Sequence, residues 1–184
     1  MGLHLIDTLD TTLLFLLLVG LTGIERLVEL RVGKKNRQWS LQQGGVEFGQ
    51  GHWPWMVALH TLFLFSMVGE VLLFPTAPMP LWSILMLGVA LSAQALRWWC
   101  IRSLGPHWNP RVIIVPGSKR ITTGPYRWLK HPNYIAVALE GIALPMVHFC
   151  WITAIGFTIA NAFLMAVRIR CENDALRQLD GHES

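Results

Sequence analysis

Residues 53–101 have the sequence WPWMVALHTLFLFSMVGEVLLF, then PTAPMP, then LWSILMLGVALSAQALRWWCI. The first and third pieces each supply the roughly 20 mostly apolar residues that a helix needs to cross the hydrocarbon core of a membrane. The proline-rich piece between them cannot continue a helix, so it predicts a tight turn. This stretch therefore predicts two membrane-spanning helices, over residues 53–74 and 81–101.

The composition of the whole chain indicates the same class of protein. Of its 184 residues, 53% are hydrophobic and 14% are charged, whereas a soluble domain usually has about 25% charged residues. These values argue against a soluble globular enzyme and exclude a disordered chain or a coiled coil. The net charge of +4 would suit a nucleic-acid partner, but the apolar content indicates a membrane instead. We therefore predict an all-α integral membrane protein that binds no nucleic acid.

Three more helices are predicted from the remaining apolar runs. The first covers residues 11–30, and we expect it to be a retained membrane helix rather than a signal peptide, because residues 1–10 carry no basic residue. A fourth helix covers about 132–147, and a fifth covers about 149–167 and continues in the cytosol to about residue 179. The fourth is short for a full crossing. Full spans and a tilted, partly inserted hairpin are therefore both open for the last pair.

The basic residues predict the orientation of the chain. All 15 lysines and arginines lie near the end of the first or third helix, between the third and the fourth, or after the fifth. Because basic residues favour cytosolic loops, this distribution predicts five crossings, with the N-terminus outside and the C-terminus in the cytosol. The two long loops, residues 31–52 and 102–131, are then cytosolic, and long loops tend to be functional.

The chain is predicted to form a single membrane-embedded domain, residues 1–184. Three helices make up residues 1–101, and a loop with a helical hairpin makes up residues 102–184. We find no Walker loop, no G-x-G-x-x-G after a strand and no Cys/His spacing typical of a metal site, so no metal is predicted. The segment GGVEFGQG at 44–51 is glycine-rich without a preceding strand, and we interpret it as a flexible loop.

The polar run GPYRWLKHPNY, residues 124–134, is the first candidate site. Its Gly-Pro pair predicts a turn, and His131-Pro132 predicts the start of a helix. A helix N-terminus offers backbone N–H groups and a positive dipole end to an anion. A plain helix cap with interfacial aromatic residues and snorkelling cations would explain the same residues. Both interpretations are open at this point.

Ionisable residues near the same membrane face form the second candidate site. Arg168 and Glu172 are four residues apart and share one face of a helix, where they form either a simple ion pair or part of a binding site. Glu140 lies inside the fourth apolar segment, and a charge there is costly enough to be a functional hypothesis. Its alternative is a structural ion pair with Arg97 or Arg168. Glu25, Arg26 and Glu29 are expected to pair within their own helix.

The two candidate sites together resemble the motifs of the isoprenylcysteine carboxyl methyltransferase family, over about the C-terminal half of the chain. The shared pattern is Thr123-Gly124-x-Tyr126-x-x-x-x-His131-Pro132-x-Tyr134, followed by Arg168-x-x-x-Glu172 with Leu176 beyond. The upstream stretch, with Gly44-Gly45-x-Glu47 and His52-x-Pro54, resembles a bacterial branch associated with methylating alkylpyrone-type lipids. Asn173 stands where the family has a second acidic residue, and this departure concerns the acceptor more than the cofactor.

The resemblance implies a methyltransferase that uses S-adenosylmethionine at the cytosolic face of the membrane, without a Rossmann domain. The family motifs place the cofactor contacts at Ile114, Lys119, Arg120, Ile121, Tyr126, His131, Pro132, Asn133, Tyr134 and Glu172. Arg168 would face the acceptor, and Glu140 or His107 would be the base for an acceptor that must lose a proton. We list Arg168 and Glu140 as the catalytic candidates.

The implied acceptor is a lipophilic or lipid molecule whose carboxylate, enol or phenol oxygen receives the methyl group. The implied location is a bacterial inner membrane, where membrane lipids surround a multi-pass protein. Two other classes of function are open from the sequence. An NADPH-dependent membrane reductase of a lipid would need phosphate sites, which Lys119-Arg120 and the basic residues at 127 and 130 could supply. A non-catalytic membrane scaffold would use the His-Pro-Asn-Tyr run only as a helix cap.

Overall fold

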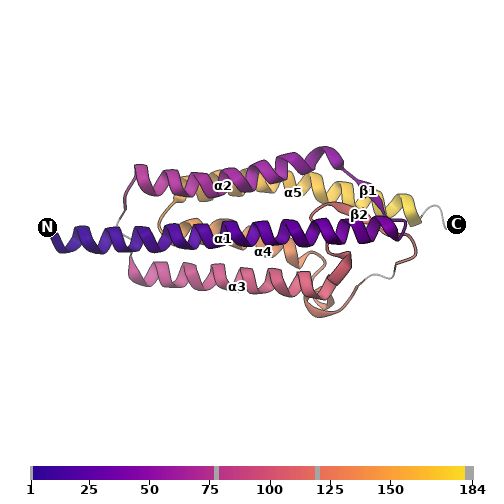
Figure 1. Cartoon of the computed structure of the whole chain (residues 1–184), viewed down its shortest axis with the longest axis horizontal. Helices are drawn as coiled ribbons and strands as arrows, with labels where there is room; N and C mark the ends of the chain where they lie inside the picture. Colours follow the sequence, from indigo (N-terminus) through magenta and orange to yellow (C-terminus); the bar gives the residue numbers. More distant parts are fainter. Residues whose placement is uncertain (1, 77–78, 119–120, 181–184) are drawn as a thin grey trace.

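The computed structural model describes residues 2–76, 79–118 and 121–180. Its long helices lie side by side in an elongated bundle, with the start of α1 at one end and the end of α5 at the other (Figure 1). The five predicted helices are confirmed as elements, although α1 extends beyond the predicted residues 11–30 on both sides. The helices are α1 (Gly2–Gln42), α2 (Trp53–Leu73), α3 (Pro80–Leu104), α4 (Pro132–Met146) and α5 (Trp151–Asp180).

Proline and glycine set several of the helix boundaries. Pro54, Pro80 and Pro132 lie in the first turns of α2, α3 and α4, where a backbone N–H would have no partner within the helix. Gly105 follows α3 with a φ of 54°, which glycine adopts without steric cost. Short 3₁₀ helices occupy the connections: η1 (Gln50–His52), η2 (Gly105–His107) and η3 (Gly124–Arg127).

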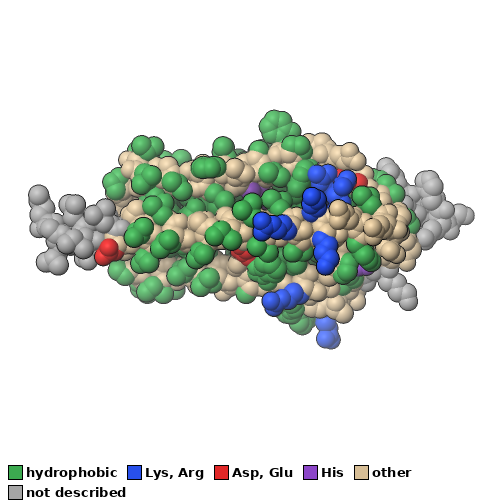
Figure 2. All heavy atoms as spheres, viewed as in Figure 1, with side chains coloured by type: hydrophobic (Ala, Val, Ile, Leu, Met, Phe, Trp, Pro, Cys, Tyr) green, Lys and Arg blue, Asp and Glu red, His purple; other side chains and the backbone are tan. Residues whose placement is uncertain are grey.

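The surface of the bundle is that of a membrane protein. The described segments Gln50–Leu73, Pro80–His107 and Trp151–Ala175 are long and apolar enough to cross a membrane. Apolar side chains cover much of the bundle surface, whereas lysine and arginine gather toward the end that holds the described parts of residues 31–52 and 102–131, which we call the basic end (Figure 2). Helix α4 has 15 residues, or about 22 Å, and is short beside a hydrocarbon core of about 30 Å. Five full crossings and the orientation stay predictions.

The apolar core of the bundle is built from all five helices. Its buried side chains interdigitate at close quarters, and a Cβ on Gly141 of α4 would meet the ring of Phe157 on α5. Glycine at this position therefore allows α4 and α5 to approach closely. The core comprises Phe15, Val19, Phe63, Met67, Val71, Ala90, Ala143, Leu144, Cys150 and Phe157.

Glu70 on α2 caps the start of α5. Its carboxylate accepts hydrogen bonds from the backbone N–H groups of Ile152 at 3.0 Å and Thr153 at 2.7 Å. These N–H groups lie in the first turn of α5, where they lack partners within the helix, and a carboxylate also matches the positive end of the helix dipole. The cap fixes where α5 begins along α2.

A small antiparallel sheet joins the two loops of the basic end. Strand β1 (Val46–Phe48) pairs with β2 (Val112–Ile114), with Glu47 opposite Ile113. The interpretation of residues 44–51 as a flexible loop is therefore wrong. Three residues are too few for a strand to be recognised from alternation of apolar and polar side chains, and the pairing partner lies more than 60 residues away.

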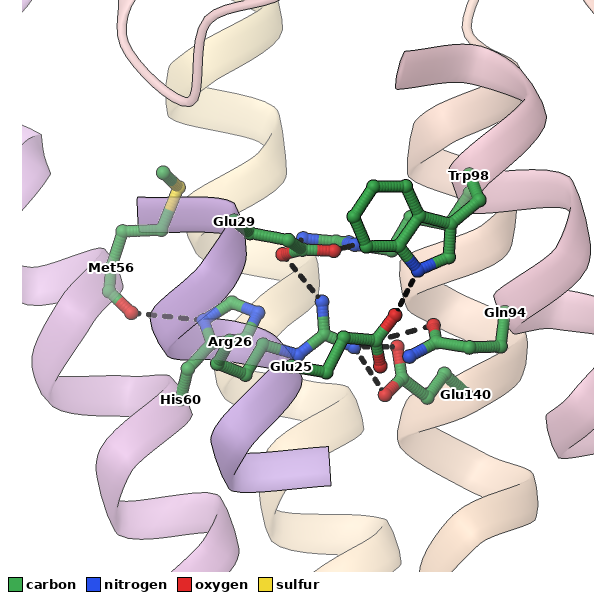
Figure 3. A network of polar contacts seen from close by, with 9 residues as sticks. Glu25, Arg26, Glu29, Met56, His60, Gln94, Trp98 and Glu140 are labelled. Atoms are coloured by element: carbon green, nitrogen blue, oxygen red, sulfur yellow. Dashed lines mark hydrogen bonds and ion pairs between the residues drawn. The ribbon is translucent and has the colours of Figure 1, made fainter. Parts of the chain in front are cut away.

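An ionic network lies inside the bundle, between α1, α3 and α4 (Figure 3). Arg26 on α1 donates to Glu140 on α4, at 2.6 Å to Oε2, and to Glu29 on its own helix at 2.8 Å. Arg97 on α3 donates to both carboxylate oxygens of Glu29, through Nε and through Nη2. Two-pronged contacts of this kind are the strongest that a guanidinium forms with a carboxylate. The network therefore joins three helices through charges.

Neutral side chains complete the network. The indole N–H of Trp98 donates to Glu25, and the side-chain oxygen of Gln94 accepts from Arg26 at 3.5 Å. His60 on α2 lies beside the network, where its Nδ1 donates to the carbonyl of Met56 at 2.9 Å. The predicted pairing within α1 is confirmed for Arg26 and Glu29, but both residues also bind partners on other helices.

We expect Glu29→Leu to lower the free energy of unfolding by about 3–5 kcal/mol, because it leaves the buried guanidinium of Arg97 without a carboxylate. The double variant E29L/R97L removes both charges and is expected to recover most of that loss. The exposed Arg31→Leu on the same helix is the control, with a change within about 0.5 kcal/mol. Denaturant titration in mixed micelles measures all three, and equal stability of E29L and R31L would contradict the role of the network.

Candidate active site

An open cleft of about 860 Å³ lies at the basic end, between the start of α4, the last turns of α5 and the loop that carries β2. Its volume is within the range of roughly 300–1,000 Å³ that small-molecule sites occupy. Apolar side chains of β2 form one wall, and polar side chains from the loop, α4 and α5 form the rest. The polar lining includes Ser40, His107, Asn109, Arg111, Tyr126, Lys130, His131, Asn133, Tyr134, Arg168, Glu172 and Asn173.

Tyr134 is the residue that brings the two predicted motifs together. Its hydroxyl donates to Glu172 Oε2 at 2.7 Å, and its ring lies parallel to the His131 ring with the centroids 5.2 Å apart. The guanidinium of Arg168 lies over the face of the same Tyr134 ring, 5.4 Å from the centroid. The start of α4 and the last turns of α5 are thus joined through one side chain.

Arg168 and Glu172 do not form the simple ion pair that their spacing allows. The ion pairs of the described residues do not include one between them. Arg168 instead donates to the carbonyl of Asn109 at 3.3 Å and to the sulfur of Met56 at 3.4 Å. These partners are neutral, and no carboxylate of the described residues lies within ion-pair distance of the Arg168 guanidinium.

Three buried polar atoms of residues that line the cleft have no hydrogen-bond partner in the described part of the chain: Asn109 Oδ1, Asn133 Oδ1 and Arg168 Nε. Buried polar groups normally find partners, so unpaired atoms in a cleft call for a ligand or water. Two acceptors and one cationic donor suit a ligand that carries both an ammonium and a carboxylate.

Tyr126 lies in η3 and lines the cleft. Burial and then the neighbouring Cys100 thiol raise the pKa of the Tyr126 phenol above its ordinary value. The phenol therefore stays protonated at neutral pH and acts as a neutral donor or apolar surface, not as a base. Pro125, just before it, is fully buried and holds the turn that η3 begins.

Most of the predicted cofactor contacts meet in the cleft. Pro132 is fully buried at the start of α4 rather than in the lining, and Lys119 and Arg120 lie outside the described residues. The predicted site residues that line the cleft are His107, Ile114, Ile121, Tyr126, His131, Asn133, Tyr134, Arg168 and Glu172.

Glu140 lies away from this group. It does not line the cleft, and its carboxylate is bound to Arg26 in the ionic network. The sequence predicted Arg97 or Arg168 as the partner of a structural ion pair with Glu140. Both are wrong, because Glu140 pairs with Arg26. Arg26 and Glu140 are 114 residues apart, so no local spacing connects them.

Sequence reasoning missed Asn109 as a site residue. Asn109 lines the cleft, its carbonyl accepts from Arg168, and its side-chain N–H donates to Ser40 Oγ at 3.1 Å. Its Oδ1 is buried without a hydrogen-bond partner among the described residues. A lone asparagine in a loop carries no recognisable motif. Its position within the long loop at 102–131 was the only available signal.

Comparisons with known proteins show the family to which the chain belongs. The family model described as isoprenylcysteine carboxyl methyltransferase family matches residues 85–178, which include the loop with β2, α4 and most of α5. A protein of Bacillus subtilis (strain 168), named uncharacterized protein YpbQ, is 40% identical over 168 residues, which cover 90% of this chain and 98% of that protein. Both motifs, residues 123–134 and Arg168 with Glu172, fall within the residues that the family model matches. The chain therefore belongs to the isoprenylcysteine carboxyl methyltransferase family of membrane methyltransferases.

Proposed function

We propose that this protein transfers a methyl group from S-adenosylmethionine to an oxygen of a lipophilic acceptor, at the cytosolic face of a bacterial inner membrane. Membership of the family supports the reaction class and the cofactor. The observation that carries the proposal is the cleft in which Tyr134 joins Glu172 to Arg168 beside the unpaired oxygens of Asn109 and Asn133. The gathering of basic residues at the same end supports the cytosolic face.

The residues of the cleft divide into two groups by charge. Glu172 would bind an ammonium group, and Asn109 and Asn133, whose buried amide oxygens have no partner among the described residues, line the cleft beside it. The positive dipole end of α4, where His131 and Pro132 begin the helix, offers a site for a carboxylate. These two groups would hold the methionyl part of the cofactor, and the apolar side chains of β2 and Ile121 would cover the nucleoside.

The bound cofactor would supply an electrophilic methyl group on a sulfonium, so the transfer needs no metal. The protein contributes orientation, which can lower the barrier substantially when donor and acceptor are held in attack geometry. Arg168 has neutral hydrogen-bond partners and no ion pair among the described residues, and it would bind an acceptor carboxylate or enolate. Such an anion needs no base. For an enol or phenol, His107 lines the cleft and would take the proton, whereas Glu140 is engaged by Arg26.

We expect Glu172→Gln to weaken binding of S-adenosylhomocysteine about tenfold, because the carboxylate that faces the ligand ammonium loses its charge while Tyr134 keeps a hydrogen-bond acceptor. Calorimetry on protein in detergent measures the affinity. Asp174→Asn, an exposed residue on the same helix, is the matched control and should bind as the wild type does. Equal affinities of the two variants would remove Glu172 from the cofactor site.

We expect Arg168→Ala to lower turnover of an anionic lipid acceptor at least tenfold while the affinity for S-adenosylhomocysteine falls by less than about threefold. The exposed Arg170→Ala is the control. Radiolabelled methyl transfer to extracted lipids reports turnover, and calorimetry reports cofactor affinity. A loss of cofactor affinity with turnover unchanged at saturating cofactor would reverse the assignment.

A further inference from the structure

The loop wall of the cleft is attached to the basic end of α1. Asn36 on α1 donates to the carbonyls of Trp108 at 2.7 Å and Gly105 at 3.1 Å. One turn further, Ser40 accepts from the side chain of Asn109. Hydrogen bonds with side chains in the C-terminal part of α1 therefore hold residues 105–109 in place.

Close packing adds to these hydrogen bonds. A Cβ on Gly33 would meet the ring of Pro110, so α1 and the loop approach closely at this glycine. The ring of Trp39 packs edge-on against His107, with the centroids 4.9 Å apart. Helix α1 therefore covers one side of the loop wall, and the other side of the wall lines the cleft.

Glu47 on β1 joins α1 to β2. Its side chain is 5% exposed, and its carboxylate accepts from Arg37 on α1 at 2.8 Å and from Arg111, next to β2, at 2.6 Å. Burial acts to raise the pKa of Glu47, but the two guanidiniums outweigh it and hold the pKa below its usual range. The carboxylate is therefore ionised at neutral pH and binds both cations.

Arg111 is held on two sides. Its guanidinium lies over the ring of Trp53 at 4.8 Å, in addition to its ion pair with Glu47. Arg111 and the three residues of β2 line the cleft, whereas Glu47 does not. Glu47 therefore contacts the lining of the cleft through its ion pair with Arg111 and its strand pairing with β2.

We propose that Glu47 is a positioning residue for methyl transfer: from β1 it fixes β2 and Arg111, and so shapes the wall against which the cofactor binds. This inference rests on the proposed function. It assigns a role in cofactor binding to residues 33–48, which precede the part of the chain that the family model matches. Side chains that orient a ligand-contacting group from behind commonly alter affinity without touching the ligand.

Three substitutions test the role of the charge at this position. Glu47→Gln keeps the shape but loses the charge, and we expect it to weaken binding of S-adenosylhomocysteine about tenfold. Glu47→Asp keeps the charge with a shorter side chain and should bind within about threefold of the wild type. Arg37→Gln should weaken binding about threefold, and it should add nothing in the E47Q background because both changes break the same contact. The control is Arg31→Gln, an exposed arginine on the same helix with no described ion pair.

A second readout needs no ligand. Amide hydrogen exchange of peptides that cover residues 105–118 should be faster in E47Q than in the wild type, while peptides from α5 should be unchanged. This combination separates a loosened wall from general destabilisation, which would speed exchange in α5 as well.

Wild-type affinity in a folded E47Q protein would overturn the inference, as would equal losses in E47Q and E47D. If E47Q does not fold, R37Q decides: an affinity equal to that of R31Q would overturn the inference, and a loss confined to R37Q would support it. A wild-type protein that binds no S-adenosylhomocysteine would overturn the proposed function itself, and the positioning role with it.

Discussion

The buried pairing of Arg26 and Arg97 with Glu140 and Glu29 is the constraint on which the arrangement of the helices depends. A charge in an apolar interior is tolerated only where a partner is held in good geometry. The network therefore allows one position of α1 along α3 and α4, and a shift by one turn would leave several charges unpaired. Apolar packing alone tolerates such shifts far better, because leucine and valine side chains can replace one another.

The position of α1 matters for the site although α1 contributes little to the cleft itself. The same helix that is fixed by charges inside the bundle continues beyond it, and there it holds the loop wall through Asn36 and Ser40. The other walls come from α4 and α5, which Tyr134 and Glu172 join at the cleft. At its other end, α5 is fixed against α2 by the Glu70 cap. Three sets of polar contacts therefore position the walls of the cleft: those of Asn36 and Ser40 with the loop, that of Tyr134 with Glu172, and the Glu70 cap.

Local signals in the sequence predicted the helices and several of the residues that line the cleft. Proline at the first turns of α2, α3 and α4 marks a boundary by its own chemistry, so it is visible without a structure. The spacing of Arg168 and Glu172 places both on one helix face for the same kind of reason. The partners of Glu140 and Glu47 could not be predicted, since the pairs with Arg26 and Arg111 join residues 114 and 64 positions apart. The role of Tyr134 as the link between two motifs depends on tertiary packing in the same way.

The surroundings of Arg168 bear on how a reaction cycle would end. Its guanidinium contacts a carbonyl oxygen, a thioether and the face of an aromatic ring, so its charge is stabilised without being cancelled. An acceptor that arrives as a carboxylate or enolate would supply the missing negative charge. Methylation of that oxygen converts the anion into a neutral ester or ether, which the guanidinium attracts far less. Under the proposed reaction, the chemical step would itself weaken the hold on the product, and the methylated lipid would leave for the bilayer without a separate release mechanism.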